Sequence, residues 1–320
     1  MITVRLFAVI RLLQTEVITV PLFKTVLGDI SERDLGVTLA HEHICCFSEY
    51  AYQMVGDKYL DKERLLNVAV DYLKSLKEKY FLNTFIDCTP VNIGRDVELL
   101  KRISEKSEIN IICSTGFYYT DEPVLYNTSA VQLCKYMFAD AYTVNAGIIK
   151  CAVEQETVSD FQENLLRACA KAHFHTGLPV VLHSNAKNKN ALLALGVLFS
   201  EGVNPNAVTV GHLSDTDDLE YVKSIASYGC FIGLDRLYKN TSEEYVSKKT
   251  QSILELCKAG YEDQILLSHD ALFFNGFEAE PKIYEQPGFS YCFDYILPQL
   301  PKSLSDKLMV QNPMRMLSCK

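Results

Sequence analysis

Two histidines, His41 and His43, stand on either side of Glu42 in the segment GVTLAHEHI, at the end of an apolar run. In an extended strand, successive side chains point to opposite faces, so the two imidazoles share one face and Glu42 lies on the other. Neutral imidazole is a common metal ligand. Two imidazoles side by side at the end of a strand therefore make a metal site the first hypothesis for this segment.

Further metal-competent side chains lie in separate apolar runs that are rich in β-branched residues. Taken alone, each of them would more often be a buried histidine bonded to a backbone carbonyl, or an aspartate that caps a helix. Their matching positions on separate runs favour a shared site instead. They are Lys150 in AGIIKCAVE, His183 in LPVVLHSN, His212 in AVTVGHL and Asp270 in QILLSHD.

Lys150 lies between Ile149 and Cys151 in a run that we expect to be a buried strand. Burial disfavours the charged ammonium and leaves a neutral, nucleophilic amine. Such an amine can capture carbon dioxide, and the resulting carbamate is a carboxylate that can bridge two divalent cations. The alternative is a lysine that reaches solvent or pairs with an acid.

The elements that must position these residues alternate along the chain. Eight apolar runs predict strands, and amphipathic stretches between them predict helices over 61–80, 95–107, 159–177 and 242–260. The last two of these helices end in glycine, as helices often do. The predicted strands are 36–43, 83–89, 110–116, 146–154, 178–185, 207–213, 230–236 and 264–270.

Eight strand–helix units with nearly continuous apolar strands predict an α/β fold, a closed (β/α)8 TIM barrel with a parallel sheet buried on both faces. A doubly wound open sheet would normally carry a Gly-rich phosphate loop after an early strand, and the sequence has none. We expect one barrel domain over 23–320 and a short N-terminal arm over 1–22. Side chains at the carboxyl ends of barrel strands meet at one mouth, so the candidate residues should converge there.

Three further histidines serve as a comparison. His173 and His175 lie in a helical pattern before Gly177, where a cation in the last turn favours the helix dipole. His269 precedes Asp270 and should therefore point the opposite way, into the barrel wall. We assign none of the three to a metal.

The composition narrows the partners. The chain has 320 residues, 48% of them hydrophobic, a net charge of −9 and no cluster of basic residues, which argues against nucleic acid or an anionic membrane surface. There is no apolar run of the roughly 18 residues that a transmembrane helix requires, and Arg11 and Glu16 interrupt the N-terminal stretch that superficially resembles a signal peptide. The 11 scattered cysteines indicate reduced thiols. We expect a cytoplasmic homodimer that acts on a small molecule.

The series TLAHEH, GIIKCAVE, VVLHSN, GHLSDTDDLEYV, GLDR, LLSHD and NPMRML resembles the phosphotriesterase family of the amidohydrolase superfamily, from about Phe23 to the end. The resemblance implies a hydrolase with two divalent metals. Zinc is expected, although manganese, cobalt or iron would also suit these ligands. The resemblance also implies that carboxylated Lys150 bridges the two metals. It further implies that His41, His43 and Asp270 hold the more buried metal and that His183 and His212 hold the more exposed one.

The expected chemistry is attack by a hydroxide that bridges the metals, with Asp270 accepting its proton. Arg236 in GLDR stands where true phosphotriesterases have histidine and resembles the lactonase-like branch of the family. Tyr118 resembles the tyrosine that this branch sets over the metals, and Asp215 should pair with Arg236. For Tyr118, Asp215 and Arg236, the alternative is scaffold that lines the mouth.

The substrate is the least determined feature. An apolar run after Asp270 favours a lactone or ester with a hydrophobic part, although these residues could instead pack the loop after the last strand onto the barrel. A sugar-phosphate lactone is the alternative, because Lys239 or Lys282 could contact its phosphate. A phosphotriester or a small N-acyl amide would also suit such a centre. The chain could instead be a metal-binding protein without catalysis, but Asp270 argues against this, because a purely structural site need not keep an exposed acid beside open coordination. The apolar run comprises Leu272, Phe273, Phe274 and Phe277.

Overall fold

The structure, a computed structural model, describes residues 22–120, 122–238 and 240–319. Within them, nine strands form one sheet in the order β10-β9-β8-β7-β6-β5-β4-β3-β11, and each neighbouring pair is parallel. The strands are β3 (Val37–Cys46), β4 (Leu82–Asp87), β5 (Asn110–Gly116), β6 (Ile148–Ala152), β7 (Val180–His183), β8 (Val208–Val210), β9 (Phe231–Leu234), β10 (Ile265–Leu267) and β11 (Leu272–Asn275).

The two strands at the ends of this order are consecutive in the chain. Strand β10 pairs with β9, and β11 pairs with β3. Between them, the Asp270 backbone N–H donates to the carbonyl of His41 (3.0 Å), and the His43 N–H donates to the carbonyl of Ala271 (3.0 Å). The segment 265–275 therefore closes the sheet on itself and acts as an eighth barrel strand in two parts. The predicted (β/α)8 barrel is confirmed.

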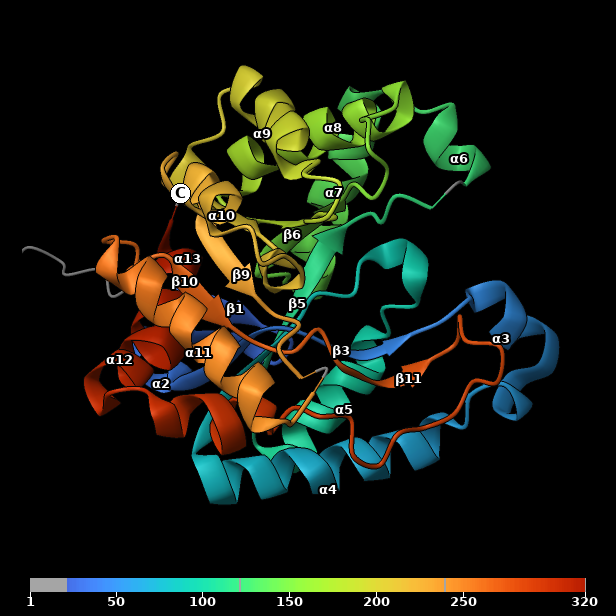
Figure 1. Ribbon diagram of the computed structural model, residues 1–320. Coiled ribbons are helices and arrows are strands. Elements are labelled where there is room, and N and C mark those ends of the chain that lie inside the picture. The colour runs from blue at the N-terminus through green and yellow to red at the C-terminus, as the bar shows by residue number, and fades with distance from the viewer. Residues whose placement is uncertain (1–21, 121, 239, 320) are drawn as a thin grey trace, which may run out of the picture.

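Helices surround the strands (Figure 1). The four predicted helices are present close to their predicted limits, and their end residues explain where they start and stop. Asp61 and Ser159 accept hydrogen bonds from the first turns of α4 and α8, and Gly177 ends α8 in a left-handed conformation with φ 69°. The longer helices are α4 (Lys62–Tyr80), α5 (Val97–Ser107), α7 (Ala130–Val144), α8 (Asp160–Thr176), α9 (Ala191–Ser200), α10 (Leu219–Ala226) and α11 (Glu243–Lys258).

Short elements complete the described chain. Strands β1 (Leu22–Thr25) and β2 (Gly28–Ser31) form an antiparallel hairpin, which is joined to β5 by a hydrogen bond from Val26 to Ile111. The expected N-terminal arm lies outside the described residues, apart from Leu22. No helix among the described residues is long and apolar enough to span a membrane. The short helices are α2 (Glu32–Leu35), α3 (Glu49–Val55), α6 (Pro123–Tyr126), α12 (Lys302–Asp306) and α13 (Asn312–Ser318).

The segment after Asp270 differs from the sequence prediction. Residues 272–275 are a strand, β11, and not a loop. Phe273 is fully buried, with its ring 5.8 Å from that of Tyr72 on α4 and 5.1 Å from that of Phe289. Phe274 is 1% exposed and packs on Tyr59. Both phenylalanines thus belong to the core between the sheet and its covering elements, and the prediction that they flank the substrate pocket is wrong.

Candidate metal centre

The six residues predicted to hold metals converge at the carboxyl ends of the barrel strands. Five of them are at most 6% exposed, and the side chain of Asp270 is 13% exposed. Because they come from several strands, only closure of the barrel brings them together. His41 and His43 lie on β3, Lys150 on β6 and His183 at the end of β7, while His212 and Asp270 follow β8 and β10.

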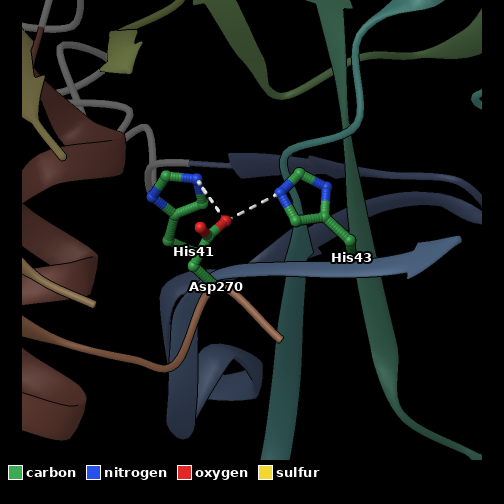
Figure 2. Close-up of side chains that lie close together, drawn as sticks. All are labelled: His41, His43 and Asp270. Atoms are coloured by element: carbon green, nitrogen blue, oxygen red, sulfur yellow. Dashed lines mark hydrogen bonds and ion pairs between the residues drawn. The ribbon is translucent and has the colours of Figure 1, made fainter. Parts of the chain in front are cut away.

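Asp270 lies between the two histidines of β3 (Figure 2). Its Oδ1 is 3.1 Å from His43 Nε2 and 3.6 Å from His41 Nε2. Lys150 adds a second contact, because its Nζ donates a hydrogen bond to His41 Nε2 at 2.6 Å. One carboxylate, two imidazoles and an amine thus share a small volume at the floor of the barrel mouth.

In three of the histidines, the ring nitrogen that points away from the centre contacts a carboxylate. We call this the outer nitrogen of each ring, and the other one the inner nitrogen. Asp235 Oδ2 is 2.6 Å from His41 Nδ1, and Asp235 Oδ1 is 3.0 Å from His212 Nδ1. Glu154 Oε2 is 3.0 Å from His183 Nε2. A carboxylate only accepts hydrogen bonds, so these outer nitrogens carry the ring protons. The inner nitrogens, His41 Nε2, His212 Nε2 and His183 Nδ1, are therefore unprotonated.

His43 has its outer nitrogen beside a hydroxyl. Its Nδ1 is 2.8 Å from Thr89 Oγ1, and that hydroxyl donates to the carbonyl of Cys45 at 3.4 Å. Thr89 therefore has an oxygen lone pair for the Nδ1 proton of His43. The arrangement turns His43 Nε2 inward, towards Asp270.

The inner atoms form a set that suits cations. His183 Nδ1 and His212 Nε2 face each other at 2.7 Å, although both protons lie on the outer nitrogens. Two lone pairs at that distance repel unless a positive charge stands beside them. His43 Nε2 lies 3.1 Å from Oδ1 of the Asp270 carboxylate, where either a proton on the ring or a metal cation can offset the negative charge. The donor types and their directions thus fit divalent metal ions on both sides of the centre.

The pKa values agree with this assignment. Burial, with Lys150 adding to it, lowers the pKa of His41 to about 4, and burial holds the pKa of His212 well below its ordinary value. Burial would raise the pKa of Asp270, but His212 and Arg236 outweigh it and hold that pKa well below its usual range. Neutral imidazoles and an ionised carboxylate are the forms that bind metals.

His43 is the exception among the histidines. Burial would lower its pKa, but Cys46 and Asp270 outweigh burial and raise the pKa to about 10. Without a metal, the ring of His43 is therefore protonated, and this proton offsets the negative charge of Asp270. A bound metal cation would offset the same charge.

Glu42, the residue between the two histidines of β3, positions the segment that carries Asp270. It points away from the mouth, as predicted, and is fully buried. Its Oε1 accepts hydrogen bonds from Ser268 Oγ (2.7 Å) and from the backbone N–H of His269 (2.9 Å), and its Oε2 accepts from the N–H of Ala271 (3.0 Å). His269 Nδ1 also contacts Glu42 at 2.6 Å, so the prediction that His269 faces the barrel wall is confirmed.

Two of the candidate ligands have unusual backbone conformations. His212 has φ 65° and Asp270 has φ 51°, the left-handed region that residues other than glycine rarely adopt. Such strain persists where the surrounding structure imposes it, and it is frequent at functional sites. His212 lies two residues after β8 and Asp270 lies three residues after β10, so both left-handed residues are at carboxyl ends of barrel strands, where the mouth lies.

A cavity of about 420 Å³ opens onto these residues. It includes two of the four residues of the predicted apolar flank, Leu272 and Phe277, together with the predicted Tyr118 and Arg236. The tyrosine ring lies 5.2 Å from that of His183, edge to face. The lining residues are His43, Cys46, Ile93, Tyr118, Tyr119, Thr120, Lys150, His183, Arg236, Asp270, Leu272, Asn275 and Phe277.

Arg236 connects two acids at the side of the cavity. Its Nη1 donates to Asp215 Oδ2 at 3.0 Å and its Nε donates to Asp270 Oδ2 at 2.7 Å. The predicted Asp215–Arg236 pair is confirmed. Arg236 therefore holds one oxygen of Asp270, while the other oxygen faces the histidines.

The residues that contact the outer histidine nitrogens are not among those predicted from the sequence. Asp235 directly precedes Arg236 in GLDR, and Glu154 ends the run that contains Lys150. A polar side chain just after a buried strand was the available signal for both. Thr89 had the same position after β4, but threonine is too common there to be informative.

The fold and the site define a (β/α)8 barrel protein with a candidate binuclear metal centre. The model of the Phosphotriesterase family matches residues 21–317, and the chain belongs to this family. It is 34% identical over 249 residues to the aryldialkylphosphatase of Saccharolobus solfataricus, which covers 75% of this chain and 78% of that protein.

Two further relatives match nearly their whole length. The phosphotriesterase homology protein of Mycobacterium tuberculosis is 28% identical over 319 residues, covering 92% of this chain and 97% of the relative. The human N-acetyltaurine hydrolase is 24% identical over 347 residues, covering 93% of this chain and 98% of the relative. The names of these relatives thus point to different substrates.

Proposed function

We propose that this chain is a hydrolase that uses two divalent metal ions to cleave a neutral lactone or related carboxylic ester. The observation that carries the proposal is the pair of unprotonated nitrogens, His183 Nδ1 and His212 Nε2, which face each other at 2.7 Å. Membership of a family with hydrolases supports the reaction type. When bound, the ions would supply an activated water and polarise the carbonyl of the substrate. The ligands would be His41, His43 and Asp270 for the more buried ion, and His183 and His212 for the other.

Lys150 would complete the centre as a carbamate. The amine is 1% exposed, and no carboxylate of the described residues lies within ion-pair distance of it. The neutral amine attacks carbon dioxide, a nitrogen–carbon bond forms, and one proton leaves. The product is an anion, which offsets the charge of two cations better than an ammonium would. Both of its oxygens would be available to bridge them.

Asp270 and Tyr118 would act on the substrate and the attacking water. Asp270 is ionised and its Oδ1 faces the metal side, so it can accept a proton from the water while Arg236 holds Oδ2. Burial raises the pKa of Tyr118 well above its ordinary value, so its hydroxyl stays protonated. It can therefore donate a hydrogen bond to a substrate oxygen.

The charges around the cavity favour a neutral substrate. Among the described lining residues, Lys150 donates to His41, and Arg236 is occupied by two carboxylates. Lys282 is not part of the lining, and Lys239 lies outside the described residues. A phosphate or sulfonate on the substrate would find no uncommitted cation in that described lining. This argues for a plain lactone over a sugar-phosphate lactone or an N-acyl amino sulfonate.

A phosphotriester is the second candidate, because it is also neutral and because the aryldialkylphosphatase is a relative. A substrate panel on the zinc-loaded protein tests the proposal, with γ- and δ-lactones, an aryl dialkyl phosphate, an N-acyl amino sulfonate and a sugar-phosphate lactone. We expect the highest kcat/KM on a lactone. A higher value on the phosphotriester or on either anion would replace the lactone assignment.

A further inference from the structure

Asp235 connects the two halves of the candidate centre from behind. Its side chain is 1% exposed. One oxygen, Oδ2, accepts from His41 Nδ1 at 2.6 Å, and His41 is one of the residues proposed above to hold the more buried ion. The other oxygen, Oδ1, accepts from His212 Nδ1 at 3.0 Å and from the His212 backbone N–H at 2.8 Å, and His212 is one of the residues proposed above to hold the other ion.

The carboxylate has little room to move. A Cβ atom at Gly211 would lie 3.1 Å from Asp235 Oδ2, and one at Gly233 would lie 3.0 Å from it. Both distances are shorter than ordinary van der Waals contact, so a side chain at either position would crowd the carboxylate. The two glycines thus define a close-fitting slot between β8 and β9, and the orientation of Asp235 follows from it.

We propose that Asp235 is a positioning residue that sets the affinity of both metal positions at once. The inference rests on the proposed function, which requires two bound cations. A histidine binds a metal through Nε2 only when its proton is on Nδ1. Asp235 holds that proton on His41 and on His212, one ring in each half. Removing an outer partner of a metal-ligating histidine typically costs about 10- to 100-fold in metal affinity.

The other residues that contact outer histidine nitrogens each contact a ligand of one metal position only. Thr89 contacts His43, and Glu154 contacts His183 and Asn185. Thr89→Val and Glu154→Ala therefore serve as matched controls. Each should weaken one of the two metal dissociation constants and leave the other close to the wild-type value.

Asparagine at position 235 gives the sharpest contrast, because it has one acceptor and one donor where aspartate has two acceptors. His212 presents two donors to Asp235, its ring N–H and its backbone N–H, so the asparagine oxygen should stay on that side. The amide NH2 then faces His41 Nδ1 and cannot accept its proton. Asp235→Asn should therefore weaken the buried position, and Asp235→Ala should weaken both.

The experiment titrates the apo-protein with Zn²⁺ against a competing chelator, and native mass spectrometry counts protein with no, one or two metals. We expect about a 10- to 100-fold rise in both dissociation constants for Asp235→Ala, and in one constant for Asp235→Asn. The double variant Asp235→Asn/Glu154→Ala should then lose affinity at both positions. Circular dichroism of each apo variant checks folding, and the tautomers of His41 and His212 in nitrogen-15 spectra carry the test of both positions if the alanine variant does not fold.

The possible results separate the inference from the proposed function. A wild-type protein that binds no metal would overturn both. Wild-type binding of two metals, with Asp235→Asn and Asp235→Ala changing the same single constant or neither, would overturn the inference alone. An Nε2–H tautomer at His41 or His212, seen in nitrogen-15 spectra of the wild-type apo-protein, would also overturn it.

Discussion

Arg236 and Asp270 are joined by a hydrogen bond of 2.7 Å from the guanidinium Nε to Oδ2 of the carboxylate. The arginine follows β9 and the aspartate follows β10, so the bond fixes two neighbouring strand ends. It also gives the two carboxylate oxygens different partners. Oδ2 is held by the arginine, and Oδ1 remains for His41 and His43.

Replacement of Arg236 by lysine should lower kcat/KM on a lactone by roughly 10- to 100-fold, because an ammonium cannot bond Asp215 and Asp270 in the same fork geometry. The loss corresponds to about 1.5–3 kcal/mol, the usual value of a hydrogen bond to a charged group. Steady-state kinetics measure it, with metal content checked in parallel. Unchanged kinetics at full metal content would show that this bond does not orient Asp270 for catalysis.

Replacement of Asp270 by asparagine should reduce turnover by about two orders of magnitude or more, because a proton acceptor is lost. At least one metal should remain bound, since most of the ligands are intact. Single-turnover kinetics together with metal analysis separate the chemical step from metal loss. Turnover at the wild-type level would contradict the role of Asp270 as proton acceptor.

Mass analysis of the native protein should show the added mass of one carbon dioxide on Lys150. Lys150→Met should lose activity, because methionine cannot form the bridging carboxylate, and short carboxylic acids should restore part of it. Lys171, which lies on α8 and pairs with Glu201, provides a control, and Lys171→Met should keep its activity. An unmodified Lys150 in an active protein with a full metal complement would refute the carbamate.

Removal of the metals should lower thermal stability, because bound ions stabilise the folded state alone. At a free metal concentration of 100 times the Kd, one site adds about 2.7 kcal/mol, which is roughly 4 °C in Tm for a chain of this size. Differential scanning calorimetry before and after chelation measures the shift, and zinc should restore it. No change in Tm on chelation would mean that the six residues do not hold metals in the folded protein.

Two phenylalanines of the same segment should respond in opposite ways. Phe277 lines the cavity and is 57% exposed, so Phe277→Ala should lower the preference for a long-tailed over a short δ-lactone on the order of 10-fold, with stability unchanged. Phe273 is in the core, so Phe273→Ala should cost about 3–5 kcal/mol of unfolding free energy. Equal kcat/KM for both lactones in the wild-type protein would exclude a hydrophobic-tail site.

The sequence by itself determined the barrel and the candidate ligands. Strands buried on both faces require continuous apolar runs, and the residues that end those runs must meet at one mouth, so the position of His183 or Asp270 follows from local pattern. The alternation of side chains along β3 likewise predicted that His41 and His43 share a face while Glu42 points away.

Only the tertiary structure decided which groups hold those ligands and which side chains form the pocket. Asp235 contacts His41 across 194 positions of sequence, and no local pattern records such a distance. Residues 272–275 were predicted to be a loop, because their strand forms only by pairing with β3, which is far away in sequence. That pairing places Phe273 and Phe274 in the core. Local propensity fixes the direction of a side chain along its own strand, whereas its partners depend on how distant strands are set in register when the barrel closes.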